Sequence, residues 1–171
     1  LSKIQRPFAY GDNPLPIGHG QTISQPYIVA FMTEVLKVKP HHAVLEIGTG
    51  CGYQAAILSL LVKNVISLEI VKALANSTKK RLKKLNYQNI EVFCFNGKKG
   101  WDNDAPYDRI ITTAAPTRVP DALIEQLAPN GQMVIPVGPD VNHQCLHIIT
   151  KNKRGFIQTK QSLPVRFVPM I

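Results

Sequence analysis

Residues 45–52 read Leu-Glu-Ile-Gly-Thr-Gly-Cys-Gly and decide the fold of this chain. A short apolar run leads into three alternating glycines, Gly48, Gly50 and Gly52, and a helix-like pattern follows them. Glycine tolerates a positive φ and lets the backbone approach a ligand closely. In open α/β sheets, a loop at the carboxyl end of the first strand is a common nucleotide site. The pattern therefore favours a nucleotide-binding loop over its alternative, a tight turn with a purely structural role.

Strand-like and helix-like segments alternate around this loop. The predicted strands are residues 43–47, 65–70, 90–95, 108–112 and 132–137, and the helices between them are residues 53–62, 71–85 and 121–127. An earlier helix is predicted to start with Ser24 as N-cap and Pro26 in its first turn, and to continue toward Pro40. Strands separated by helices form right-handed βαβ units. The chain is therefore predicted to have an α/β fold, with a mostly parallel, Rossmann-like sheet and helices on both faces.

The pattern changes after Gly138. Residues 145–150, 156–160 and 165–168 are strand-like with no helix between them, which predicts antiparallel C-terminal strands at the sheet edge. Residues 1–23 are rich in glycine and proline and are predicted to form an ordered loop or cover. A length of 171 residues without a linker or repeat fits a single domain over residues 1–171.

An acidic residue follows at the end of the second predicted strand. Glu69 lies 21 residues after Gly48, where a carboxylate can accept hydrogen bonds from both hydroxyls of a ribose; the alternative is a solvated strand end. The glycine spacing is G-x-G-x-G, whereas dinucleotide sites have G-x-G-x-x-G. The spacing looks like the S-adenosylmethionine loop of class I methyltransferases, whose ligand carries no pyrophosphate.

The composition limits the class of protein. The three cysteines, Cys51, Cys94 and Cys145, form no C-x-x-C pair, which favours a reducing compartment, and no metal site is expected. No run approaches the roughly 20 apolar residues of a membrane span, and no signal peptide is recognised. We therefore expect a cytoplasmic protein without a membrane partner.

The net charge is +9, and basic residues gather at positions 79–84. The helical period places Leu74, Leu82 and Leu85 on the opposite face, which we expect to be buried. A solvated outer helix face is favoured over an RNA-binding stripe, because no aromatic residues interleave with the lysines. No nucleic-acid partner is therefore expected.

Several motifs together resemble one enzyme family. They are Leu-Pro-Ile-Gly-His-Gly-Gln-Thr-Ile-Ser-Gln-Pro (residues 15–26), Gly-Thr-Gly-Cys-Gly-Tyr (48–53), Gly-Trp (100–101), Ala-Pro-Tyr-Asp (105–108) and Val-Arg-Phe-Val-Pro (165–169). From Tyr10 onward the chain is similar to bacterial protein-L-isoaspartate O-methyltransferases. The resemblance implies a class I methyltransferase that uses S-adenosyl-L-methionine as co-substrate to methylate the free α-carboxylate of L-isoaspartyl residues. The implied partners are damaged proteins and peptides that contain isoaspartate, and the expected state is a monomer.

The resemblance also implies the residues of the site. Ser24 is the implied catalytic residue, which orients the substrate carboxylate or the methyl donor; its alternative role is the helix N-cap. The implied cofactor-binding residues are Thr22, Ile23, Gly48, Gly50, Cys51, Gly52, Glu69, Asn96 and Gly97. Asn96 stands where the family has Asp, and Cys51 stands where it has Ser. The family's helical N-terminal segment is absent from the sequence, so we expect the methyltransferase domain without it.

Two other functions stay open. A nucleic-acid methyltransferase would share the cofactor fold and the +9 charge. Its amino-methylating forms carry an Asn/Asp-Pro-Pro-aromatic motif after the fourth strand, but residues 112–116 here read Thr-Thr-Ala-Ala-Pro. The other alternative is a truncated, inactive protein with the cofactor fold, which the start of the sequence and Asn96 keep open.

Overall fold

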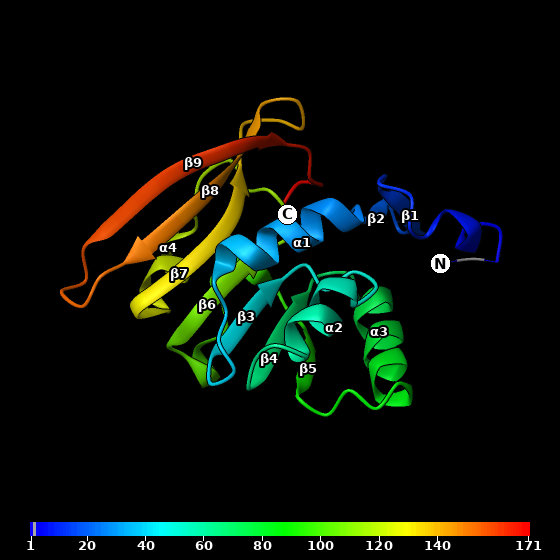
Figure 1. Ribbon diagram of the computed structural model, residues 1–171, viewed down its shortest axis with the longest axis horizontal. Coiled ribbons are helices and arrows are strands. Elements are labelled where there is room, and N and C mark those ends of the chain that lie inside the picture. Colours follow the sequence, from blue (N-terminus) through cyan, green and yellow to red (C-terminus); the bar gives the residue numbers. More distant parts are fainter. Residues whose placement is uncertain (2) are drawn as a thin grey trace.

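A seven-stranded sheet forms the centre of the computed structural model, which describes residue 1 and residues 3–171 (Figure 1). The sheet order is β5-β4-β3-β6-β7-β8-β9. The strands are β3 (Ala43–Ile47), β4 (Asn64–Glu69), β5 (Ile90–Cys94), β6 (Tyr107–Thr112), β7 (Leu127–Val137), β8 (Gln144–Lys151) and β9 (Ile157–Val165). The first five of these in sequence pair in parallel, whereas β8 is antiparallel to both β7 and β9. The predicted parallel sheet with antiparallel C-terminal strands is confirmed.

Helices cover both faces of this sheet. The α-helices are α1 (Pro26–Leu36), α2 (Tyr53–Ser59), α3 (Lys72–Lys84) and α4 (Asp121–Glu125). Short 3₁₀ helices are η1 (Arg6–Phe8), η2 (Gly97–Lys99) and η3 (Asp102–Asp104), and a separate hairpin is formed by β1 (Leu15–Gly18) and β2 (Gln21–Ile23).

The parallel strands are apolar on both sides, as expected for strands that helices cover from both faces. Val44 packs in the cluster that includes Met32 of α1 and Leu58 of α2. The adjacent residue Leu45 points to the other face and joins the cluster that includes Leu123 of α4. All five hydrophobic side chains named here are essentially inaccessible to solvent.

The predicted N-cap of the first helix is wrong. The N-cap of α1 is Gln25, and neither it nor Ser24 caps the helix with a side chain. Pro26 has no backbone N–H, so Tyr27 is the first residue of the helix with a donor to satisfy. The carboxylate of Asp12 accepts a hydrogen bond from Tyr27 N at 3.1 Å and another from the Gln25 side chain at 3.3 Å. The cap is therefore supplied from an earlier turn of the chain.

Four other boundaries differ from the prediction. Leu85 is 60% exposed, because α3 ends at Lys84 and Leu85 is its C-cap. The helix predicted over residues 121–127 ends at Glu125, and β7 starts at Leu127. The last two predicted strands are replaced by the single strand β9, whose side chains are mostly exposed. Residues 1–23 contain the β1–β2 hairpin, whose strands are too short to be recognised by alternation.

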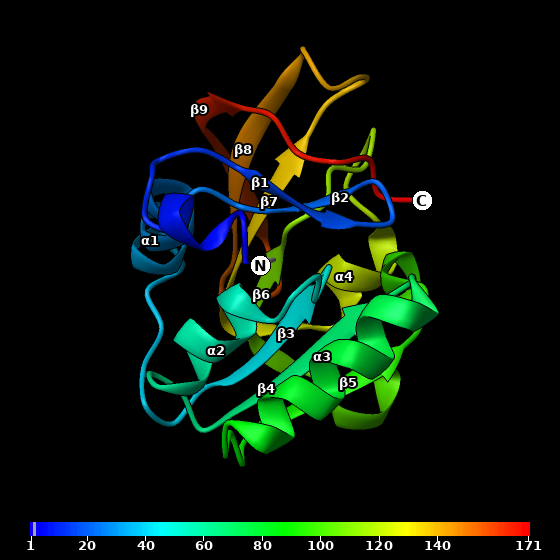
Figure 2. The same cartoon turned by 90° about the vertical axis from the view of Figure 1, so that its right-hand side faces the viewer.

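The hairpin and the C-terminal residues lie over the carboxyl ends of the parallel strands (Figure 2). Residues 168–171, named here the C-terminal strap, are joined to the loop after β6 by two hydrogen bonds: Ala115 N donates to Val168 O, and Met170 N donates to Ala115 O, each at 2.9 Å. This arrangement places the β1–β2 hairpin and the C-terminal strap above the carboxyl ends of the parallel strands (Figure 2). None of the helices in the described part of the chain is long and apolar enough to cross a membrane.

Candidate active site

The glycine loop joins β3 to α2 and has an unusual backbone. Gly48, Gly50 and Gly52 have φ values of +97°, +51° and +85°, a region that side-chain-bearing residues rarely adopt. A Cβ on Gly48 would collide with the Thr113 hydroxyl, and one on Gly52 would collide with Thr78 of α3. Glycine is therefore required here both by conformation and by space.

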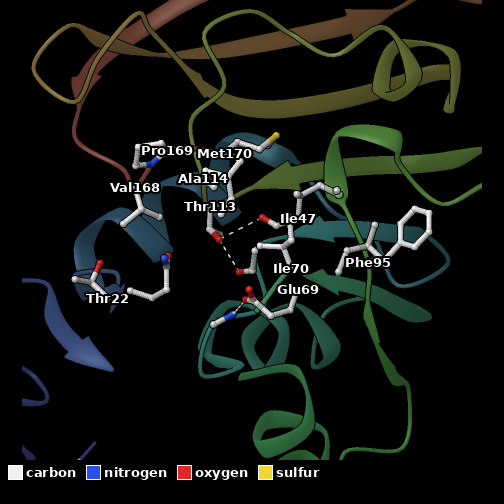
Figure 3. A pocket seen from close by; sticks show the side chains of 16 residues that line it. Thr22, Ile47, Glu69, Ile70, Phe95, Thr113, Ala114, Val168, Pro169 and Met170 are labelled. Carbon is white, nitrogen blue, oxygen red and sulfur yellow. Dashed lines mark hydrogen bonds between the residues drawn. The ribbon is translucent and has the colours of Figure 1, made fainter. Parts of the chain in front are cut away.

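Glu69 fixes the loop from the neighbouring strand. It is the last residue of β4 and is 5% exposed. Its Oε2 accepts a hydrogen bond from Gly50 N at 2.8 Å (Figure 3). Its Oε1 accepts one from Val71 N at 2.9 Å. Each carboxylate oxygen has a second lone pair, so Glu69 can still accept hydrogen bonds from a ligand in the pocket.

A pocket lies between this loop, the ends of β4 and β5, and the C-terminal strap. Its floor is apolar, with Leu68 and Ile70 near Glu69 and with Phe95 at the end of β5. The residues that line it are Gln21, Thr22, Ile47, Gly48, Gly50, Leu68, Glu69, Ile70, Phe95, Gly97, Thr113, Ala114, Val168, Pro169, Met170 and Ile171. An apolar wall with a few convergent polar groups is typical of a small-molecule site.

A second groove adjoins this pocket and contains Ser24. It runs between the start of α1 and the segment that follows β9, and it is lined by Pro14, Thr22, Ser24, Gln25, Tyr27, Ile28, Thr113, Asn142 and residues 163–168. The two cavities share Thr22, Thr113 and Val168. A molecule in the pocket and a segment in the groove would therefore meet at these three residues.

Thr113 stands at the junction of the two cavities. Its backbone N–H donates to Ile47 O at 2.8 Å, and its hydroxyl donates to Gly48 O at 2.6 Å (Figure 3). Because the hydroxyl proton is used by the glycine loop, the oxygen lone pairs remain free toward the cavities. Thr113 therefore orients the glycine loop and also forms part of the wall between the pocket and the Ser24 groove.

A buried polar cluster supports the loop from below. The Ser67 hydroxyl donates to Glu46 Oε2, and the hydroxyls of Thr49 and Ser67 lie 2.6 Å apart. Complete burial raises the pKa of Glu46 to about 8, and the negative charge of Glu69 adds to this effect. Glu46 is therefore a neutral carboxylic acid at pH 7 and connects the core to Thr49 of the glycine loop.

The structure brings some of the predicted site residues together. Thr22, Gly48, Gly50, Glu69 and Gly97 line the pocket, and Ser24 lines the adjoining groove. The Ser24 hydroxyl makes no hydrogen bond to any residue that the structure describes, so it is available to a ligand.

The other predicted cofactor residues lie beside the pocket rather than in its wall. Ile23 pairs with Leu15 in the hairpin, and Gly52 is the N-cap of α2. Cys51 lines a different cavity under the N-terminal segment, and burial raises the pKa of its thiol. The side-chain oxygen of Asn96 accepts from Lys98 N at 3.0 Å, so it is committed to capping η2.

Sequence reasoning missed Thr113 and the C-terminal strap. Thr113 lies in residues 112–116, which were considered only because they lack the amino-methyltransferase motif, and the strap overlaps the family motif of residues 165–169 without a site role having followed from it. Thr113 comes directly after β6, where side chains at the carboxyl end of the sheet meet the site. The position of Thr113 directly after a predicted strand could therefore have identified it as a candidate site residue.

A parallel sheet of this order, with a glycine loop after one strand and a buried acid at the end of the next, defines a class I S-adenosylmethionine-dependent methyltransferase. The chain belongs to the protein-L-isoaspartate(D-aspartate) O-methyltransferase family, whose model matches residues 2–171. The family predicted from the sequence motifs is thereby confirmed.

Three relatives describe the extent of this similarity. A protein named protein-L-isoaspartate O-methyltransferase 1 from Cupriavidus necator is 53% identical over 167 residues, which cover 98% of this chain and 64% of that protein. A solved protein-L-isoaspartate O-methyltransferase superposes with a TM-score of 0.87 at 27% identity, covering 96% of this chain and 54% of the other. A Plasmodium falciparum protein described as an enzyme of the same kind, solved with S-adenosyl-L-homocysteine, has a TM-score of 0.79 and 30% identity over 95% of this chain and 81% of its own. The chain thus spans less than two thirds of the first relative.

Within the described residues, no group of three or more His, Cys, Asp and Glu side chains is arranged to hold a metal ion.

Proposed function

We propose that this chain transfers a methyl group from S-adenosyl-L-methionine to the free α-carboxylate of L-isoaspartyl residues in damaged proteins. The observation that carries the proposal is the contact between the glycine-loop pocket and the Ser24 groove at Thr22, Thr113 and Val168. A methyl donor in one cavity and a peptide carboxylate in the other would meet there in line, as a displacement requires.

The residues of the pocket fit this co-substrate. Glu69 offers lone pairs for the ribose hydroxyls, and the absence of side chains at Gly48 and Gly50 lets the backbone approach the amino-acid part. The apolar surface of Leu68 and Ile70 suits a flat base. Together with Thr22 and Gly97, these residues are the proposed binding set, and Asn96, Cys51, Gly52 and Ile23 support it from the neighbouring positions.

The reaction needs little from the protein beyond positioning. When bound, the co-substrate supplies an electrophilic methyl carbon on a sulfonium. The substrate carboxylate is ionised at pH 7 and needs no general base. Ser24 donates a hydrogen bond to the carboxylate oxygen that does not attack, while the C-terminal strap and the hairpin keep water out.

The bonds balance without another reactant. The carboxylate oxygen forms a bond to the methyl carbon as the carbon–sulfur bond breaks, and S-adenosyl-L-homocysteine leaves as the neutral thioether. The methyl ester then closes spontaneously to a succinimide with release of methanol. Water opens the succinimide in part to normal aspartate, which is how the damage is repaired.

The other features fit the same proposal. Three cysteines without a disulfide, Cys51, Cys94 and Cys145, favour a reducing compartment such as the cytoplasm. The proposal also includes a single domain over residues 1–171. This domain acts as a monomer, and its partners are isoaspartyl proteins and peptides.

The decisive experiment uses methyl-labelled S-adenosyl-L-methionine with an isoaspartyl peptide, the same peptide with normal aspartate, and an RNA. We expect label that mild base releases as methanol from the isoaspartyl peptide alone. Stable label in the RNA would instead identify a nucleic-acid methyltransferase. No label, with binding of S-adenosyl-L-homocysteine by calorimetry, would identify a protein that retains the fold without the activity.

A further inference from the structure

The positive charge of the chain is concentrated in one region. Residues 72–99 contain eight lysines and arginines and one acidic residue, Glu91. This region therefore carries a net charge of +7, out of +9 for the whole chain. It comprises α3, β5 and η2, and Figure 1 shows α3 beside β5 at one end of the sheet. We name this region the α3–β5 face.

The basic residues of α3 exceed what helix stability requires: Arg81, Lys83 and Lys84 in the last turn suit the helix dipole, but the lysines also repel one another along the exposed side. Leu74, Ala75, Thr78 and Leu82 form its buried side, and its lysines are exposed. Lys79 and Lys83 are four residues apart, as are Lys80 and Lys84, and like charges at this spacing repel each other. The helix contains no acidic residue. A sequence chosen for helix stability alone would alternate the two signs of charge.

These lysines also lack counter-ions within the described part of the chain. The ion pairs found there join Arg118 to Asp121 and Asp140 to His143, far from α3 in sequence. Of the cations on the helix, Arg81 is held by the Cys51 carbonyl and the Thr78 hydroxyl. The remaining positive charge is free to attract an anionic partner.

The nearby acidic residues leave the face positive. Glu91 is exposed on β5 and alternates with Val92, which packs under α3, so it shares a side of the strand with Phe93 and is a single negative charge beside the lysines. Asp102 accepts a hydrogen bond from Gln126, and Asp104 accepts one from the indole of Trp101. Both belong to η3 and keep their negative charge, so residues 72–104, with eight basic and three acidic side chains, still carry a net charge of +5.

Aromatic side chains continue the face beyond the lysines. Lys79 Nζ lies 5.9 Å from the centre of the Phe93 ring, which stacks on Trp101 with centroids 4.3 Å apart. Trp101 meets Phe95 edge-on at 5.2 Å. Phe95 is 37% exposed, and in Figure 3 its ring points away from Glu69. The sequence of α3 concealed this feature, because β5 and the segment after it supply the aromatic rings.

We propose that the α3–β5 face binds single-stranded nucleic acid. Lysines that attract phosphates, combined with aromatic rings on which bases stack, are the two components of sequence-tolerant single-strand binding. An acidic protein segment would match the charge but would gain nothing from the rings. The inference concerns binding only, does not depend on methyl transfer, and gives the chain a second kind of partner.

The test measures the fluorescence anisotropy of a labelled oligoadenylate RNA of about 20 nucleotides at ~0.1 M salt. The variant combines Lys79→Glu and Lys80→Glu, which places each new glutamate four residues before a lysine, Lys83 or Lys84, and should not lower Tm. We expect it to weaken RNA binding at least about tenfold and to reduce the salt dependence of log Kd by about one unit or more. The matched control combines Lys153→Glu and Arg154→Glu at the exposed β8–β9 turn, which changes the net charge equally. It should bind RNA like the parental protein.

Three results would overturn the inference. Equal weakening in both double variants would mean that net charge alone attracts the RNA. Polyglutamate of equal charge that binds as tightly as the RNA would mean that an acidic protein is the partner. Absence of RNA binding by the parental protein at this salt concentration would remove the function altogether. Methyl transfer to an isoaspartyl peptide, measured on the same samples, reports separately on the proposed enzymatic function.

Discussion

Asp12 Oδ1 lies 3.1 Å from Tyr27 N and caps α1 from fifteen residues away. The same carboxylate holds the Gln25 side chain. The hydrogen bond from Tyr27 N to Asp12 joins the N-terminal segment to the start of α1. Ser24, which lines the substrate groove, lies directly beside this contact. Because Asp12 performs the capping, Ser24 is released from it, and stability and catalysis can be tested at separate residues.

Asp12→Ala should therefore destabilise the protein. It removes the acceptor for Tyr27 N, and loss of a helix cap costs about 0.5–2 kcal/mol. Asp12→Asn keeps an oxygen acceptor and should cost less than the alanine variant. Denaturant unfolding of the three proteins measures this order. An alanine variant as stable as the parent would show that water replaces the carboxylate at no cost.

Glu69→Ala should weaken binding of S-adenosyl-L-homocysteine. It removes both the proposed ribose acceptor and the bond that holds Gly50 N. Charge-assisted hydrogen bonds of this kind contribute about 1.5–3 kcal/mol, which corresponds to roughly 10- to 100-fold in Kd. Calorimetric titration gives the value, and Glu91→Ala, which removes an exposed glutamate of β5, is the control. Equal affinities of the Glu69 and Glu91 variants would exclude Glu69 from the site.

Thr113→Val should separate turnover from cofactor binding. Valine keeps the shape of the side chain but leaves Gly48 O without its hydrogen-bond donor. The glycine loop would then shift at the cavity junction, and the methyl donor and the carboxylate would be less well aligned for reaction. We expect kcat to fall at least about tenfold, while Kd for S-adenosyl-L-homocysteine rises less than about tenfold. Thr113→Ser retains the hydroxyl and should restore most of kcat. A valine variant with the parental kcat, or a serine variant as slow as the valine variant, would show that the hydroxyl alone does not determine the rate.

Glu46 should make stability depend on pH. Its folded pKa of about 8 lies above the ordinary value of 4.5, so between these values the folded chain binds a proton that the unfolded chain has lost. The free energy of unfolding should therefore be fully retained below about pH 4.5, fall as pH rises, and level off above about pH 8. The total fall is roughly 3–5 kcal/mol. Glu46→Gln cannot titrate, so its unfolding midpoint between pH 5 and 8 should be flatter; an unchanged slope would assign the dependence to other groups.

Local signals were sufficient to predict the sheet. Short apolar runs that end in glycine or acid marked β3 and β4, and the helical period marked α3 between β4 and β5. The glycine spacing placed Gly48 and Glu69 at one site because the ends of adjacent parallel strands are neighbours. These inferences needed only residues that are close in sequence.

Features that join distant segments could not be predicted in this way. The cap of α1 depends on Asp12 approaching Tyr27, and the cavity junction depends on Thr22, Thr113 and Val168 meeting. Neither helical period nor alternation encodes such contacts. Ser24 was consequently given a capping role on the basis of residue type alone.

Substitutions of Ser24 test the proposed mechanism most directly. Its hydroxyl has no partner among the described residues, so Ser24→Ala should leave the unfolding midpoint unchanged, in contrast to Asp12→Ala. Turnover on an isoaspartyl peptide should fall roughly 10- to 100-fold, as expected for a lost hydrogen bond to a charged group. Ser24→Asp should be slower still, because a second anion repels the substrate carboxylate in a cavity with little water. Kd for S-adenosyl-L-homocysteine should change little in either variant, since Ser24 lies in the groove and not in the pocket wall. An aspartate variant that melts normally and methylates at the parental rate would exclude Ser24 from the reaction.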